Sequence, residues 1–347
     1  MVPNALQVAI RRLAAGESLT DADAAAAFGL VMNGEATPAQ VAALLMGLRV
    51  KGETPGEVAG AARALRDAMI RIDAETPGQL VDTCGTGGGA VTTFNISTAA
   101  GLLAAGAGLR VAKHGNRSFT SQCGSADVLE ALGVPLDATP PHMAQVLREA
   151  GVVFMFAPTM HPAMRHVGPV RRELAVQTVM NLVGPLANPA GAGRQVVGVA
   201  ERRRMALLAG ALAALGSRRA LVVHGEPGMD EVSPLGPTYV TEVDPAGLRE
   251  WILDPATLGL GAFRPEELAG GSPADNAQIV SEILDGRGAP GARAAVILNA
   301  AAALYVGGMG RTIQSCVALA SQAVDSGAGR QALDRMRTAY ARARDGA

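Results

Sequence analysis

The sequence predicts an α/β protein in which a small N-terminal helical domain precedes a larger domain with a central, mostly parallel sheet. Three observations lead to this prediction. The chain has 347 residues, which is more than a single hydrophobic core usually contains, and its length therefore suggests two domains. The first seventy residues show only helical periodicity. After Pro77-Gly78, apolar strand-like segments alternate with helical ones, which is typical of a parallel sheet covered on both faces.

Four short helices are expected in the first seventy residues. Asn4 precedes the first helix, which Gly16 ends, and Thr20 caps the second. Thr37 and Thr54 each precede a proline at the first helical position and a capping-box residue three positions on. Because each helix has an apolar face, the four must pack on the second domain, on a second copy of the chain, or on both.

Five strands are expected in the larger domain. They lie at 80–84, 110–113, 152–156, 196–199 and 221–224, with helices at 97–107, 125–132, 203–215, 275–286, 291–306 and 311–325. In sheets of this kind, ligands bind beyond the carboxyl ends of the strands. The candidate sites are therefore the loops after Cys84, Lys113, Phe156 and His224.

Composition excludes several classes of function. Lys+Arg total 30 against 31 Asp+Glu, a formal net charge of −1, which lacks the basic excess of nucleic-acid binding proteins. There is no run of about eighteen apolar residues and no apolar signal core, so neither a membrane span nor export is expected. Three cysteines without metal-binding spacing fit a reducing compartment. We expect a cytoplasmic protein.

The first candidate loop is GTGGGAVTTFNIST, residues 85–98. Its glycines let the backbone approach an anion, and it ends at a helix start, where free N–H groups favour phosphate. An ordinary tight turn is one alternative. Gly85, Gly87 and Ala90 also match a dinucleotide fingerprint, but the β-branched residues 91–94 delay the helix. No acidic residue between 90 and 126 could hold a ribose, so a nicotinamide site is not expected.

Three further segments gather polar residues. KHGNRSFTSQCGS, from Lys113 to Ser125, suits a polyanionic, hydroxylated ligand, or is a solvated loop. Residues 156–189 form an irregular crossing between helices, in which one arginine of the pair Arg171-Arg172 could reach a ligand carboxylate. Asp230-Glu231 suits Mg²⁺ bound together with substrate phosphates, although such a pair alone is usually solvent-exposed.

Together these segments resemble the anthranilate phosphoribosyltransferase family from end to end. The motifs that carry the resemblance are GTGG…TFNIST, KHGNRS, GSADVLEALG, HPAM…VRREL…NLVGPLANP and DEVSPLGPT. The resemblance implies transfer of the phosphoribosyl group of phosphoribosyl pyrophosphate (PRPP) to anthranilate in tryptophan biosynthesis, with Mg²⁺. It implies a nucleoside phosphorylase/phosphoribosyltransferase fold, with a helical domain at 1–73 joined in space by about 166–190. The α/β domain would comprise 74–165 and 191–347, and a homodimer would form through the helical domain.

The resemblance also assigns site residues. PRPP would bind at Gly85, Gly88, Thr93, Asn95, Ser97, Thr98, Lys113, Ser121 and Ser125. Anthranilate would meet Gly85, His114, Asn116, Arg171 and Pro185, and Mg²⁺ would lie at Ser97, Asp230 and Glu231. No general base is assigned, because the neutral aromatic amine loses its proton easily once bonded. Positioning and electrostatic stabilisation of an oxocarbenium-like transition state would carry the reaction.

Two positions depart from the family pattern. Gly89 replaces a common aspartate and Gln122 replaces a frequent lysine, so we expect altered handling of PRPP and of a second Mg²⁺. The two changes would partly offset, since one negative and one positive charge are lost together. Two other functions stay open from the sequence: a pyrimidine nucleoside phosphorylase of the same fold, and a non-catalytic relative that binds nucleic acid.

Overall fold

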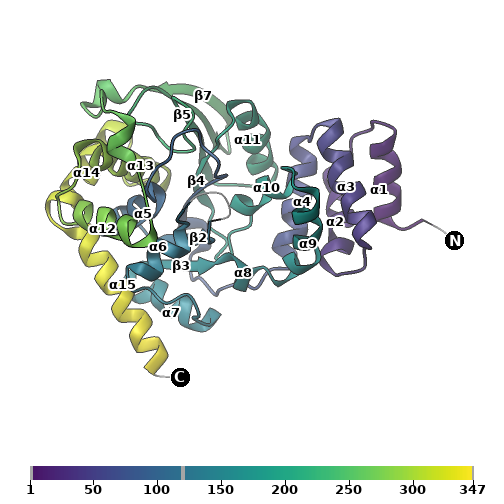
Figure 1. The fold of residues 1–347 in the computed structure, drawn as a ribbon, viewed down its shortest axis with the longest axis horizontal. Coiled ribbons are helices and arrows are strands. Elements are labelled where there is room, and N and C mark those ends of the chain that lie inside the picture. The colour runs from purple at the N-terminus through teal and green to yellow at the C-terminus, as the bar shows by residue number, and fades with distance from the viewer. Residues whose placement is uncertain (1–2, 119–121, 346–347) are drawn as a thin grey trace.

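The computed structural model describes residues 3–118 and 122–345, which form a helical end and a larger body built on one sheet (Figure 1). The helical end contains α1 (Ala5–Ala14), α2 (Asp21–Met32), α3 (Pro38–Lys51) and α4 (Pro55–Asp67). The side chains of Asn4, Thr20, Thr37 and Thr54 each accept a hydrogen bond from the backbone N–H of the third helical residue. The four predicted helices and their capping residues are thus confirmed.

The larger body contains a seven-stranded sheet in the order β3-β2-β1-β4-β5-β6-β7. The strands are β1 (Val81–Gly85), β2 (Val111–Gly115), β3 (Val152–Phe156), β4 (Arg194–Gly198), β5 (Arg219–Gly225), β6 (Thr238–Asp244) and β7 (Gly247–Leu253). The first five pair in parallel, as predicted. The hairpin β6–β7 adds two antiparallel strands that the sequence did not predict.

Helices cover both faces of the sheet. They are α5 (Ile96–Gly106), α6 (Ser125–Ala131), α7 (Pro140–Ala150), α11 (Met205–Ala214), α12 (Pro273–Leu284), α13 (Pro290–Gly307), α14 (Ile313–Asp325) and α15 (Ala328–Asp345). Val196 belongs to the core under α5 and α13, whereas the next residue, Val197, belongs to the core under α11. This alternation of successive side chains gives the sheet its two apolar faces. None of the described helices is both long and apolar enough to span a membrane.

The predicted irregular crossing connects the sheet to the helical end. It consists of α8 (Ala157–Met160), η2 (Pro162–His166), α9 (Gly168–Leu174), α10 (Met180–Val183) and η3 (Gly184–Leu186). Here α9 packs on α3 and α10 packs on α4, while α4 also contacts α11 (Figure 1). One apolar core therefore runs from the helical bundle to the α11 face of the sheet.

Candidate active site

Three loops meet beyond the carboxyl ends of β1, β2 and β5. The segment after β5 passes over the end of β4, where a Cβ atom on Gly198 would lie 1.6 Å from the Asp230 carbonyl oxygen. Only glycine therefore permits this crossing. The segment then contacts the glycine loop after β1: the Gly87 N–H donates to Asp230 Oδ2 at 2.8 Å, and the Ala90 N–H donates to the Gly228 carbonyl at 2.8 Å.

A cavity of about 680 Å³, called the loop cavity below, lies where these loops meet. Most of the site residues named from the sequence line it: Gly85, Gly88, Thr93, Asn95, Ser97, Lys113, His114, Asn116, Ser125, Asp230 and Glu231. The two departures from the family pattern, Gly89 and Gln122, line it as well. The structure thus gathers residues from loops more than a hundred positions apart in the chain.

Three of the named residues that the structure describes do not line the loop cavity. The Thr98 side chain is buried within α5, and its backbone N–H donates to the Asn95 carbonyl at 3.1 Å, so the structure gives it no direct access to a ligand there. Pro185 is buried in η3, and Arg171 is half-buried in α9. Ser121 lies outside the described residues.

Lys113 places a buried amine on the wall of the loop cavity. Its Nζ contacts the Thr83 carbonyl and lies 3.2 Å from Ser97 Oγ, and the side chain is 5% exposed. Burial lowers the pKa of Lys113, while the negative charge of Asp82 opposes that shift. Within the described part of the chain Lys113 forms no ion pair, so an anionic ligand would be its first direct counter-charge.

Asp230 and Glu231 place two carboxyl groups on the wall of the same cavity, and neither forms an ion pair with another described residue. Burial raises the pKa of Asp230. Burial and then the neighbouring Asp230 raise the pKa of Glu231 to about 8, against the positive charge of Lys113 and a hydrogen bond from the Ser97 backbone. A bound cation would remove this cost, so the pair fits Mg²⁺. Since the described residues hold no cluster of three or more metal-ligating side chains, substrate oxygens and water would complete the coordination.

Amide and hydroxyl groups hold the first two loops together. The Asn95 side chain donates through Nδ2 to the Cys123 carbonyl at 3.2 Å and accepts through Oδ1 from Asn276 at 2.9 Å. The Ser125 hydroxyl donates to the Asn116 carbonyl at 3.3 Å. Sequence reasoning missed Asn276, because a single asparagine 181 positions away in α12 carries no local signal.

A pair of buried histidines lies beside the cavity. The Nε2 atoms of His114 and His161 are 3.1 Å apart, and the rings meet edge to face with centroids 4.9 Å apart. Burial, reinforced by His161, lowers the pKa of His114 to about 3, and burial lowers the pKa of His161 to about 4. Both rings are therefore neutral at pH 7, and one Nε2 donates to the other.

A second buried network ties the crossing segment to the strands. Asn188 donates through Nδ2 to Asp82 Oδ2 and to the Ala112 carbonyl, both at 2.8 Å. The His114 backbone N–H donates to Asp82 Oδ1 at 3.2 Å, and burial raises the pKa of Asp82 to about 6. The network fixes the end of β2 and the residues that follow η3. Sequence reasoning missed it, because its members are distant in the chain.

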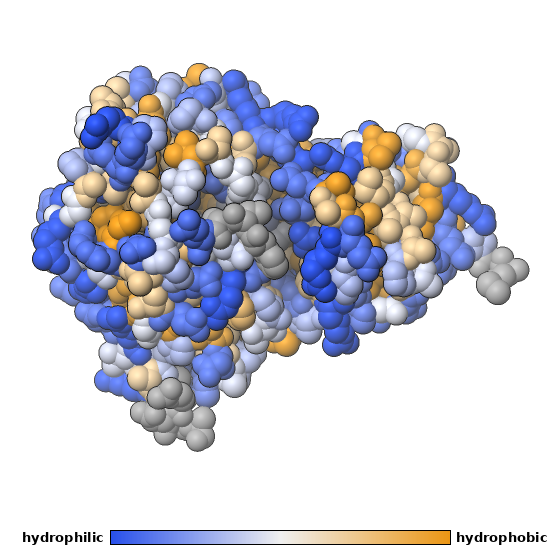
Figure 2. Space-filling model, viewed as in Figure 1, coloured by the Kyte–Doolittle hydropathy of each residue, from blue (hydrophilic) through white to orange (hydrophobic). Residues whose placement is uncertain are grey.

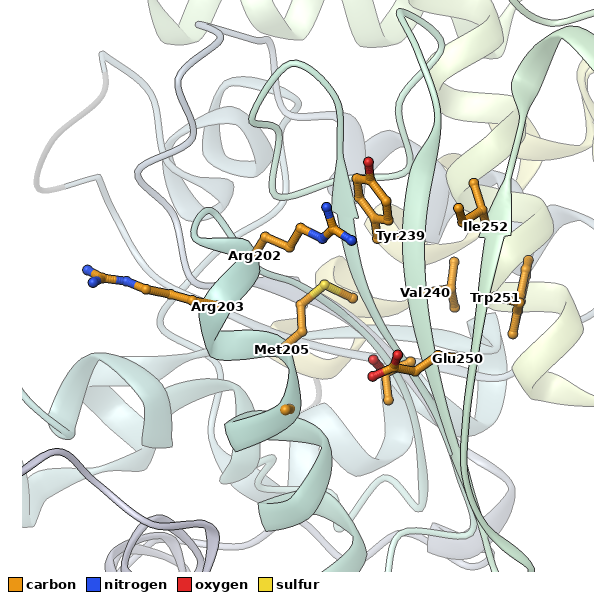
Figure 3. A pocket seen from close by; sticks show the side chains of 10 residues that line it. Arg202, Arg203, Met205, Tyr239, Val240, Glu250, Trp251 and Ile252 are labelled. Atoms are coloured by element: carbon orange, nitrogen blue, oxygen red, sulfur yellow. The ribbon is translucent and has the colours of Figure 1, made fainter.

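A further cavity of about 750 Å³, called the edge cavity below, lies between the start of α11 and the hairpin β6–β7 (Figure 3). The Arg202 guanidinium stacks over the Tyr239 ring at 3.4 Å, and Arg203 pairs with Glu201 at 2.7 Å. Met205 and Ile252 supply apolar walls. Its arginines are thus already engaged, and no glycine-rich loop reaches it.

Comparison with known proteins identifies the relatives of this chain. The helical bundle domain of the glycosyl transferase family matches residues 7–69, and the a/b domain of that family matches residues 77–330. Anthranilate phosphoribosyltransferase of Rubrobacter xylanophilus is 49% identical over 330 residues, 95% of this chain and 96% of the relative. The enzyme of Symbiobacterium thermophilum is 48% identical over 332 residues, 96% and 97% of the two chains.

Solved structures give the same result. The crystal structure of anthranilate phosphoribosyltransferase from Thermus thermophilus matches with a TM-score of 0.90 and 43% identity, over 96% of this chain and 99% of that one. The Saccharomyces cerevisiae enzyme in complex with PRPP and Mg matches with a TM-score of 0.87 and 26% identity, over 97% and 98% of the two chains.

Proposed function

The chain belongs to the anthranilate phosphoribosyltransferases of the glycosyl transferase family, and on this basis we propose that it transfers the 5-phosphoribosyl group of PRPP to the amine of anthranilate. The products are N-(5-phosphoribosyl)anthranilate and pyrophosphate, in the second step of tryptophan biosynthesis. The observation that supports this most is the loop cavity, which joins glycine-loop amides, a buried lysine and two carboxylates. The relatives favour neither the phosphorylase nor the nucleic-acid-binding alternative.

The donor side of the reaction belongs to the loop cavity. Gly85, Gly88, Thr93, Asn95, Ser97, Lys113 and Ser125 would bind PRPP there. The proposal also includes Ser121, which lies outside the described residues, and Thr98, whose side chain is buried in α5. As the bond between the anomeric carbon and pyrophosphate breaks, negative charge grows on the leaving group. Backbone N–H groups and Lys113 stabilise this charge without having to reorganise.

Asp230 and Glu231, beside Ser97, would hold Mg²⁺ against the phosphates of PRPP. The ion, when bound, supplies positive charge to the departing pyrophosphate. Burial raises the pKa of both carboxyl groups, so a bound cation would favour their ionised forms. The residues of the chain present at this site therefore fit the metal seen in the yeast complex.

The acceptor side belongs to the crossing segment together with the ends of β1 and β2. Arg171 would hold the anthranilate carboxylate with its planar guanidinium, since it makes no ion pair with any described residue. Gly85, His114, Asn116 and Pro185 would border the ring, and the neutral His114–His161 pair adds no charge that would repel or bind the amine. The amine nitrogen bonds to the anomeric carbon and then releases its proton, so no residue is needed as a strong base.

Three broader features remain proposals. We place the domain boundaries at 1–73 with 166–190, and at 74–165 with 191–347.

A homodimer forms through the helical domain. On this domain Val8 of α1 is 42% exposed and Val50 of α3 is 80% exposed, and apolar side chains gather on its surface (Figure 2). The enzyme works in the cytoplasm without nucleic acid or membrane. Sedimentation of a Val8→Glu, Val50→Glu double variant tests the dimer, and an unchanged dimer would exclude this face.

The reaction itself can be followed through anthranilate, which is fluorescent. Purified protein is mixed with anthranilate, PRPP and Mg²⁺, and the loss of fluorescence is recorded. We expect a loss that requires both PRPP and Mg²⁺, with mixtures lacking either one as controls. No loss under these conditions would contradict the proposal, and phosphorolysis of thymidine or uridine would then test the phosphorylase alternative.

A further inference from the structure

The glycine loop of the loop cavity already holds an anion that belongs to the protein. The Gly87 N–H donates to Asp230 Oδ2 at 2.8 Å. In the described part of the chain the N–H groups of Gly88 and Gly89 make no hydrogen bond. Successive backbone N–H groups in such a loop are the donors that a phosphate group takes. One of these three donors is therefore occupied by a carboxylate.

Glycines at two positions make this contact possible. A Cβ atom on Gly85 would lie 2.6 Å from Asp230 Oδ2, and one on Gly89 would lie 3.2 Å from both Asp230 Oδ1 and the Gly228 carbonyl oxygen. Gly87 and Gly88 have positive φ angles, which explains glycine there by backbone conformation alone. Gly89 has no such φ, so the backbone would accept alanine. Glycine at position 89 therefore leaves room for two groups of the segment after β5, the Asp230 carboxylate and the Gly228 carbonyl.

We propose that Gly89 is a positioning residue that lets Asp230 occupy the glycine loop in the ligand-free enzyme, so that the donor's pyrophosphate must displace this internal anion. Without a metal ion, the carboxylate and the pyrophosphate compete for the Gly87 N–H and repel each other. When Mg²⁺ is bound, Asp230 would hold the cation that also attracts the pyrophosphate, so the carboxylate would favour pyrophosphate binding where it otherwise opposes it. The inference rests on the proposed function, which places pyrophosphate in this cavity.

The experiment measures binding of inorganic pyrophosphate to the full chain by calorimetry, once in EDTA and once in Mg²⁺. In EDTA, Gly89→Ala should bind pyrophosphate about 2–10-fold more tightly than wild type. This is the effect expected from losing one competing hydrogen bond, that from the Gly87 N–H to Asp230. In Mg²⁺ the difference should fall below about twofold. Asp230→Ala should bind more tightly than wild type in EDTA but more weakly in Mg²⁺.

A matched control separates the contact from simple charge. Glu231→Ala also removes a carboxylate from the cavity, but Glu231 makes no hydrogen bond to residues 87–89. Hydrogen–deuterium exchange of residues 85–92, measured without ligand, should be faster in Gly89→Ala and Asp230→Ala and unchanged in Glu231→Ala. Gly89→Ala keeps every charge, so tighter binding by this variant cannot be an effect of net charge.

The outcomes distinguish the inference from the proposed function. If wild type binds no pyrophosphate even with Mg²⁺, the proposed function itself fails. If wild type binds it with Mg²⁺ but Gly89→Ala in EDTA binds no more tightly than wild type, only the positioning role of Gly89 is overturned. Unchanged exchange of residues 85–92 in Asp230→Ala would also overturn it, because the loop would then not depend on the carboxylate.

Discussion

The loop cavity and the edge cavity have similar volumes, about 680 and 750 Å³, but their charged groups differ in what they contact. In the edge cavity, Arg203 pairs with Glu201 and Arg202 stacks on Tyr239. In the loop cavity, Lys113, Asp230 and Glu231 lack ion-pair partners among the residues that the structure describes. A buried charge without a partner is costly to the folded protein.

This difference indicates where binding free energy can be gained. A ligand that enters the edge cavity must compete with contacts that already satisfy the arginines. A ligand with phosphates and a metal ion would instead give Lys113 and Asp230 direct counter-charges, and it would favour the ionised form of Glu231, whose pKa is raised to about 8. Perturbed ionisable groups in a cleft are typical of functional sites for this reason. For locating a functional site, the volume of a cavity is therefore a weaker criterion than the presence of buried ionisable groups without ion-pair partners.

The largest expected effect compares one cation from each cavity. Lys113→Met should lower kcat/KM for PRPP about 10²–10³-fold, because it removes a positive group aimed at the developing charge. Arg203→Ala should change it less than about twofold, since an exposed ion pair contributes little. Steady-state kinetics measures both, and thermal unfolding checks that Lys113→Met still folds. Equal losses in the two variants would break the comparison.

The next effect extends the comparison to the acceptor. Arg171→Ala should raise the KM for anthranilate about 10–100-fold, because a hydrogen bond to a charged group contributes about 1.5–3 kcal/mol. Arg172 is the matched control: it is adjacent in α9 but exposed, and Arg172→Ala should leave this KM unchanged. The KM for PRPP should not change in either variant. If the KM for anthranilate rises in Arg172→Ala and not in Arg171→Ala, the anthranilate carboxylate is bound by Arg172.

Local signals predicted most of the fold. Thr37-Pro38 and Thr54-Pro55 fixed two helix starts, because capping depends on residues three positions apart. The hairpin β6–β7 escaped prediction, since the buried Glu242 interrupts its apolar pattern. Its partners include Arg219, 23 residues away, and Tyr305, 63 residues away, so no local pattern accounts for it. Helix α7 was missed because Pro140-Pro141 suggests a loop, although proline suits the first turn of a helix.

The site could be predicted wherever a loop carries its own chemistry. The glycines at 85–89 and the pair Asp230-Glu231 are of this kind. The hydrogen bonds that position them were not predictable, because they join distant segments: Asn188 with Asp82, Asn276 with Asn95, and Gly87 with Asp230. Such contacts depend on the order of the strands, and a single sequence does not contain that order in any local pattern.

A smaller effect tests whether the loop cavity balances its charges between two positions. Gly89→Asp and Gln122→Lys restore the family's usual residues, and each should change the KM for PRPP. We express each change in the KM for PRPP as a free energy. If the two departures offset each other, the change in the double variant should be smaller than the sum of the two single changes, by about 0.5 kcal/mol or more. Kinetics of all four proteins measures the coupling. Fully additive effects would contradict the compensation.

The smallest effect concerns His114 and His161, the neutral histidines beside the loop cavity. The edge cavity has no histidine among its lining residues, so this effect belongs to the loop cavity alone. Their pKa values in the folded protein, about 3 for His114 and about 4 for His161, lie below the unfolded value of about 6.5. Between these limits the unfolded chain binds more protons, so stability is full above about pH 6.5 and falls as the pH drops.

His161→Gln removes one of these protons while keeping a hydrogen-bonding group next to His114. Its free energy of unfolding should therefore fall less steeply than that of wild type between pH 6.5 and 4, by up to about 1.4 kcal/mol per pH unit. Urea unfolding at several pH values measures both slopes. Asp82, with its pKa raised to about 6, acts with the opposite sign but is common to both proteins. Identical slopes would mean that His161 is protonated as readily in the folded protein as in the unfolded chain, and its buried hydrogen bond to His114 would then not keep it neutral.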